Sequence, residues 1–154
     1  MVYRWYRFHI YSKRDMEGIL MAETEKITIN MNVVDLGKVD LIVEQGFYSN
    51  RTDFIKTAIR NQLSSYSIVV DPLIKEKAFA VGISYFNRHL LEEALLKNKV
   101  LDIKVVGMLV FADDIDEELA FKTINSIKVY GVIKATNELK VVLNKINKGK
   151  QIVR

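Results

Sequence analysis

Residues 26–64 constrain this chain most, because an alternating segment there precedes two helical patterns. In residues 26–32 apolar and polar side chains alternate, so a strand would carry Ile27, Ile29 and Met31 on one face. A single strand cannot bury that face, and its backbone hydrogen-bonding groups lack partners. Since no second strand pattern lies in this segment, the simplest partner is the same strand of another chain.

Two such strands paired antiparallel would form a ribbon whose other face carries lysine and amide side chains. A two-stranded ribbon fits the major groove of B-DNA, where side chains of these types can bond base edges. The segment therefore predicts a homodimer that contacts double-stranded DNA.

Two helices are predicted behind the strand. The first covers about residues 34–45, with an apolar stripe at three- and four-residue spacing, and Gly46 fits its left-handed end. The second begins after Asn50, a favourable N-cap, with Asp53 completing an approximate capping box. Its apolar residues, from Phe54 to Leu63, share an inner face.

These motifs resemble a ribbon-helix-helix repressor of the CopG/Arc type over residues 26–64. The resemblance rests on the strand at residues 27–31, on Gly46-Phe47-Tyr48 at the end of the first helix, and on the string from Ser49 to Ile55. It implies a homodimeric, sequence-specific DNA-binding transcriptional regulator, expected to be a repressor, that reads the major groove with an intermolecular β-ribbon.

The resemblance also implies which residues touch DNA. The start of the second helix would clamp the phosphate backbone through the main chain of Asn50, Arg51 and Thr52, because helix N-termini bind anions. Base contacts would come from the polar face of the ribbon, where lysine suits guanine, asparagine suits adenine and threonine can touch thymine. These residues are Lys26, Thr28 and Asn30. The alternative interpretation is that the three merely form the solvated face of an edge strand.

The rest of the chain contains a repeat. Glycines at 82, 107 and 131 recur at intervals of 25 and 24 residues, each within an apolar strand pattern followed by a helical one. The predicted helices cover about residues 89–99, 115–125 and 136–145. This pattern predicts a C-terminal α/β domain of three strand–helix repeats with neighbouring parallel strands, and an α+β fold for the whole chain.

A second fold stays open for this region. An ACT-like βαββαβ sandwich follows the ribbon-helix-helix domain in nickel-responsive repressors, and the length here is similar. Nickel needs several His or Cys ligands, whereas this region offers only His89 and the chain has no cysteine. We therefore predict no metal and no cofactor. The acidic run at residues 113–118 is interpreted as a helix start, and no motif indicates an enzyme.

The expected domain boundaries follow from these patterns. Residues 1–25 form an N-terminal tail, interpreted as disordered or lying upstream of the native start rather than as a basic arm. Residues 65–76 are a linker in which residues 68–70 could form a short strand, residues 77–147 form the C-terminal domain, and residues 148–154 form a basic tail. The net charge of +4 does not carry the DNA prediction. No apolar run suits a membrane, and the expected location is the cytoplasm.

Two other functions were weighed. An antitoxin-like protein would capture a partner protein with its C-terminal part, but such segments are usually disordered until bound. A structural protein would assemble through stacked strand–helix units, whose open ends associate unless capped. In a DNA-binding regulator the C-terminal domain would add a dimer or higher-order contact, or bind an effector.

Overall fold

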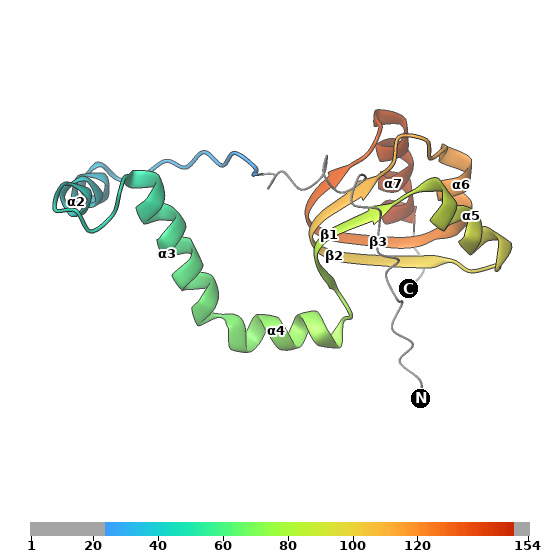
Figure 1. Cartoon of the computed structure of the whole chain (residues 1–154), viewed down its shortest axis with the longest axis horizontal. Helices are drawn as coiled ribbons and strands as arrows, with labels where there is room; N and C mark the ends of the chain where they lie inside the picture. Colours follow the sequence, from blue (N-terminus) through green and yellow to red (C-terminus); the bar gives the residue numbers. More distant parts are fainter. Residues whose placement is uncertain (1–23, 150–154) are drawn as a thin grey trace. The chain divides into compact units, whose positions relative to one another are not determined.

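The computed structural model describes residues 24–149 (Figure 1), and the contacts within this part divide it into two units, with the boundary after Ala58. The predicted N-terminal tail and basic C-terminal tail lie almost wholly outside the described residues. In the described part, three consecutive helices precede three strand–helix pairs, so the fold mixes both kinds of element. Between residues 24 and 149 no helix has the length and apolar character needed to cross a bilayer.

The N-terminal unit contains α2 (Val33–Glu44) and the start of α3 (Arg51–Ser65). Asn32 caps α2, because its side-chain oxygen accepts a hydrogen bond from the Val34 amide at 2.8 Å. At the other end Gly46 has a φ of 80°, and its amide donates to the Val43 carbonyl at 2.9 Å. The left-handed stop predicted at Gly46 is therefore present.

The predicted strand does not form in the single chain. Residues 24–32 have no regular secondary structure, and both faces of the alternating segment are exposed. Ile27 is 78% exposed and Ile29 is 55% exposed, although a folded chain would normally bury such side chains. Because the expected pairing needs a second chain, the intermolecular strand stays a prediction.

The predicted linker is helical. Residues 65–76 contain α4 (Ser67–Glu76), so the short strand considered at residues 68–70 is wrong. Pro72 lies inside this helix, where its missing amide removes one helix hydrogen bond. Ala78, the second residue after the helix, has a φ of 52° and donates its amide to the Lys75 carbonyl at 3.1 Å. Serines and a proline made this segment look irregular, but its apolar residues recur at helical spacing.

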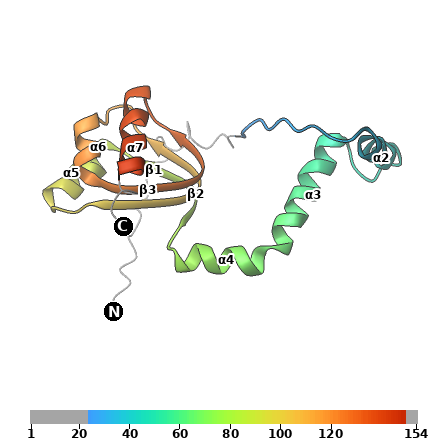
Figure 2. The same ribbon diagram turned by 180° about the vertical axis from the view of Figure 1, so that it is seen from behind.

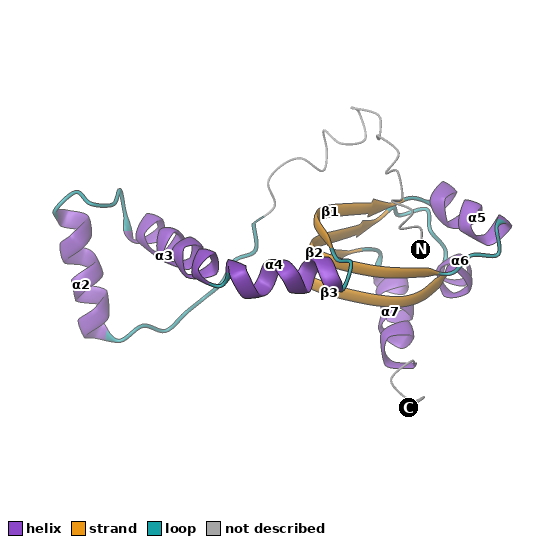
Figure 3. Cartoon of the chain, turned by 90° about the horizontal axis from the view of Figure 1, so that it is seen from below, coloured by secondary structure: helices purple, strands orange, loops and turns teal. Residues whose placement is uncertain are grey.

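The C-terminal sheet has three parallel strands in the order β1-β2-β3. A helix follows each strand, which is the order that the glycine repeat predicts and which differs from the βαββαβ alternative. The elements are β1 (Ala80–Phe86), α5 (Arg88–Leu96), β2 (Leu101–Phe111), α6 (Glu117–Thr123), β3 (Ile124–Lys134) and α7 (Asn137–Gly149). Figure 3 distinguishes these strands from the helices by colour.

The three repeat glycines form one row across the sheet, since Gly82 pairs with Gly107 and Gly107 pairs with Gly131. All three have φ between 111° and 136°, which side chains other than hydrogen rarely permit. A Cβ on Gly107 would lie 2.2 Å from the Gly82 carbonyl oxygen, and one on Gly131 would lie 1.9 Å from the Gly107 oxygen. The periodicity therefore reflects a shared positive-φ backbone conformation, and at Gly107 and Gly131 a side chain would also collide with the neighbouring strand.

The core lies between one face of the sheet and the three helices α5, α6 and α7 (Figure 2). Successive parallel strands joined by right-handed crossovers in the order 1-2-3 place all their helices on the same side. The core includes Leu91 from α5, Ala120 from α6, Leu139 from α7 and Leu109 from β2. The opposite face of the sheet receives none of these helices, and its residues lie outside the core cluster.

Candidate nucleic-acid interface

The three predicted base-reading residues are accessible. Lys26, Thr28 and Asn30 are exposed, and none of them makes a hydrogen bond or ion pair with another described residue. Their two-residue spacing places them on one side whenever the segment is extended. The single chain does not bring them against any other part of the described structure, so their roles stay predictions.

The start of α3 is held by reciprocal caps. The Asn50 side-chain oxygen accepts from the Asp53 amide at 2.9 Å, and the Asp53 carboxylate accepts from the Ser49 amide at 3.1 Å. The approximate capping box predicted at this point is therefore present, with Asp53 reaching one residue farther back than the usual pattern. These bonds fix where the helix begins.

Two amides at this helix start remain available. Within the described residues, the main-chain N–H groups of Arg51 and Thr52 donate no hydrogen bond, as expected for the first turn of a helix. Such amides, together with the partial positive charge of the helix end, suit a phosphate oxygen. The geometry thus offers two donors where the sequence predicts a backbone clamp.

The Arg51 side chain has another role, which the sequence reasoning missed. Its Nε donates to one oxygen of Asp40 at 2.5 Å and its Nη2 to the other at 2.6 Å. The hydrogen bond from Arg51 lowers the pKa of Asp40, and the same bond raises the pKa of Arg51. This bidentate pair joins α2 to the start of α3. The Arg51 guanidinium is therefore engaged within the chain, and its main-chain amide is the group that remains available.

The turn between α2 and α3 is also braced by an aromatic pair. The rings of Tyr48 and Phe54 meet edge to face, with centroids 5.1 Å apart. Together with the left-handed Gly46 and the Arg51–Asp40 pair, this contact fixes the direction in which α3 leaves the turn. The candidate phosphate donors are thus held by local contacts.

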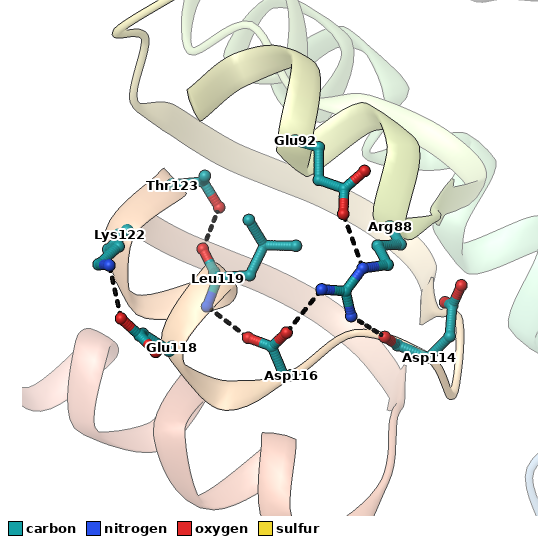
Figure 4. A network of polar contacts seen from close by, with 8 residues as sticks. All are labelled: Arg88, Glu92, Asp114, Asp116, Glu118, Leu119, Lys122 and Thr123. Atoms are coloured by element: carbon teal, nitrogen blue, oxygen red, sulfur yellow. Dashed lines mark hydrogen bonds and ion pairs between the residues drawn. The ribbon is translucent and has the colours of Figure 1, made fainter. Parts of the chain in front are cut away.

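A second polar cluster joins α5 to the start of α6, and it has a structural explanation (Figure 4). Arg88 donates to Glu92 at 2.7 Å, pairs with Asp116 at 2.9 Å and donates to the Asp114 carbonyl at 2.8 Å. Asp116 also caps α6 by accepting from the Leu119 amide at 2.8 Å. The acidic run is therefore a helix start, as predicted.

Metal-binding groups are not assembled in the described structure. Among residues 24–149, no group of three or more His, Cys, Asp or Glu side chains could hold a metal ion. His89 is exposed on α5. The described residues thus offer no candidate metal site with three or more such ligands.

Comparison with known protein families gives a match that covers most of the chain. A family model described as the Ribbon-Helix-Helix transcriptional regulator family matches residues 22–140. The match covers the alternating segment, the two helices behind it and most of the sheet unit. Neither a search of curated proteins nor one of solved structures found a match.

Proposed function

Because the chain belongs to the ribbon-helix-helix transcriptional regulator family, we propose that it binds DNA in a sequence-specific manner as a homodimer and represses transcription. Residues 26–32 of two chains pair as an antiparallel ribbon that enters the major groove. Lys26, Thr28 and Asn30 read the bases. The first-turn amides of α3 hold the flanking phosphates.

The observation that carries this proposal is the exposure of both faces of the alternating segment. Ile27, Ile29 and Met31 are all exposed in the single chain, and so are the polar residues between them. Pairing with a second chain satisfies the strand backbone and covers the apolar face at once. The polar face then remains turned outward, toward DNA.

The helix pair supports the same arrangement. Within residues 24–58 only Val39 is buried among the large apolar side chains, at 5% exposure. Leu41, Ile59 and Leu63 are exposed although they lie on helices that bear apolar stripes. A helix pair that buries one large apolar side chain and leaves several others exposed is suited to pack against a second copy, so the two copies would share a core in the proposed dimer.

The antitoxin-like alternative is less well supported. An antitoxin segment that folds only on its partner lacks a core of its own. Residues 80–149 instead contain a sheet, three helices and a buried cluster around Leu91, Leu109 and Leu139. A pre-folded domain of this kind suits a regulator whose C-terminal part adds contacts between chains.

Base reading is tested with Asn30→Ala and a DNA duplex from the region upstream of the coding sequence. Fluorescence anisotropy measures the ratio of affinities for this duplex and for a scrambled one. Losing one bidentate base contact costs about 1–3 kcal/mol, so the ratio should fall roughly 5- to 150-fold while binding to scrambled DNA survives. Asn61→Ala, an exposed asparagine on α3, is the matched control. An unchanged ratio for Asn30→Ala would remove it from the readout.

The phosphate clamp is tested by comparing Arg51→Pro with Arg51→Ala. Both variants lose the Asp40 pair, but only proline also removes the amide, and proline is well tolerated at the first position of a helix. The proline variant should bind all duplexes more weakly than the alanine variant, by a similar factor for each sequence. Equal binding by the two variants would show that this amide does not hold a phosphate.

A further inference from the structure

The face of the sheet opposite the helices, here called the open face, is apolar at its centre. Two neighbouring rows of paired residues define it, Val81–Val106–Tyr130 and Ile83–Met108–Val132. Val81, Ile83 and Tyr130 are 68%, 48% and 56% exposed, whereas Met108 on the middle strand is 9% exposed, and none of these four residues belongs to the core cluster. Parallel sheets almost always have both faces covered. This face is therefore an incomplete surface.

The rows beside the apolar centre carry charge. The next row toward the strand starts pairs Lys104 with Lys128, and the row toward the strand ends includes Lys134. An apolar centre with a charged rim is the usual anatomy of a protein–protein interface. Lysine on the rim also disfavours close approach of the sheet to an arbitrary apolar surface, because each charge must stay hydrated.

The size of the face indicates what covers it. Three strands about 4.8 Å apart and about 20 Å long present roughly 300 Å² of flat surface. Stacking two such faces buries on the order of 600 Å², about half of what a free-standing specific interface needs. A freely diffusing partner would be held weakly. A partner that is already tethered is held at an effective concentration in the millimolar range, and a small contact then suffices.

We infer that the open face packs against the open face of a second copy of this chain. The inference rests on the proposed function, because the ribbon of residues 26–32 supplies the tether. A two-fold contact is self-complementary, so the apolar rows meet each other. Each sheet is then covered on both sides, by its own helices and by its partner.

The chain contains no cysteine, so single cysteines report contacts without background. In the full-length protein, Val81→Cys, Ile83→Cys and Tyr130→Cys sample the open face. Leu96→Cys on α5 and Val141→Cys on α7, both exposed, are the controls on the helical side. Mild oxidation or a short bismaleimide should yield covalent dimers from at least one open-face variant and none from the controls. The yield should not change with protein concentration once the dimer is formed.

Ile29→Cys, tested in parallel, separates this inference from the proposed ribbon. If Ile29→Cys cross-links and the open-face cysteines behave like the controls, the open face is not a contact between copies. If an open-face cysteine cross-links while Ile29→Cys does not, the ribbon fails and the sheet contact stands. If Ile83→Cys instead forms an intramolecular disulfide with Val70→Cys, α4 of the same chain covers the face and the inference is wrong.

A charge substitution gives a second measurement. Ile83→Asp places a carboxylate in the centre of the apolar rows while leaving the core cluster untouched. The dimer dissociation constant from analytical ultracentrifugation should rise at least tenfold, with the circular dichroism spectrum unchanged. Phe121→Asp, at an exposed position on α6, should leave the constant unchanged. Equal dissociation constants for Ile83→Asp and wild type would overturn the contact.

Discussion

The two units of this chain differ in where their apolar residues lie. In the sheet unit, buried side chains from β2, β3 and three helices form one continuous core. In residues 24–58, by contrast, Val39 is the one large apolar side chain that is buried, and Val33, Val34 and Leu41 on α2 are exposed. The sheet unit buries a core against one of its faces, whereas the N-terminal unit buries few apolar side chains and would gain a shared core only in the proposed dimer.

Because of this contrast, we expect the stability of the two units to depend differently on protein concentration. A unit that folds only with its partner couples folding to dimerisation, so its apparent stability depends on protein concentration. A unit with its own core unfolds at a denaturant concentration set by the chain itself. Substitutions in both units therefore test this division.

The largest effect is expected from Leu109→Ala in the centre of β2. Leu109 is 0% exposed and lies in the core cluster, so its removal should lower the free energy of unfolding of the sheet unit by about 2–5 kcal/mol. Urea denaturation followed by circular dichroism measures the change, which should be independent of protein concentration. Leu96→Ala, at a position 84% exposed, should shift the free energy by no more than about 0.5 kcal/mol. Similar losses for both variants would contradict the assigned core.

The second-largest effect is a difference in stability between alanine substitutions at two glycines of the sheet row. Gly131→Ala places a methyl group against the Gly107 carbonyl oxygen, and Gly82→Ala meets no atom within 4 Å. Both variants carry the strain of a positive φ, about 1–3 kcal/mol. Gly131→Ala should destabilise by roughly 1–3 kcal/mol more, because the adjacent strands must move apart. Denaturation curves of the two variants provide the measurement, and equal losses would mean that the close approach of the strands is not rigid.

Local sequence signals predicted elements in both units. Glycines at 82, 107 and 131 revealed the repeat, and the strand pairing then placed them in one row. The cap at Asn50 and the helix start in the acidic run at residues 113–118 were also predicted, since a cap and its helix lie within a few residues. These features depend on neighbours in the sequence.

Features that depend on distant pairs were harder to predict. The pair between Asp40 and Arg51 bridges 11 residues across a turn, and no periodicity marks it. The helix α4 was missed because Pro72 and the adjoining serines are typical of connectors. The alternating segment at residues 26–32 gave a clear strand pattern, yet a single chain cannot test it, because its expected partner is another molecule.

A smaller effect compares two left-handed helix ends. Gly46 and Ala78 occupy the same position after α2 and α4, with φ of 80° and 52°. Alanine pays about 1 kcal/mol or more for this conformation, so Ala78→Gly should raise the stability of the sheet unit by roughly 0.5–1 kcal/mol. Gly46→Ala should lower that of the N-terminal unit by a similar amount. Thermal denaturation at fixed concentration measures both, and a loss on Ala78→Gly would contradict the left-handed end of α4.

The smallest effect concerns acid stability. The hydrogen bond from the Leu119 amide, aided by Arg88, lowers the pKa of Asp116 below its ordinary value of 3.8. A carboxyl group whose pKa is lower in the folded state stabilises the fold above the unfolded value, and this contribution disappears as the pH falls through the folded value. Wild type should therefore lose stability more steeply below pH 3.8 than Asp116→Asn, which keeps a good cap but cannot titrate. Denaturation between pH 2 and 6 measures the slopes. The exposed Asp113, changed to Asn, should keep the wild-type slope; a flattened slope in that control instead would assign the acid sensitivity to the acidic run as a whole.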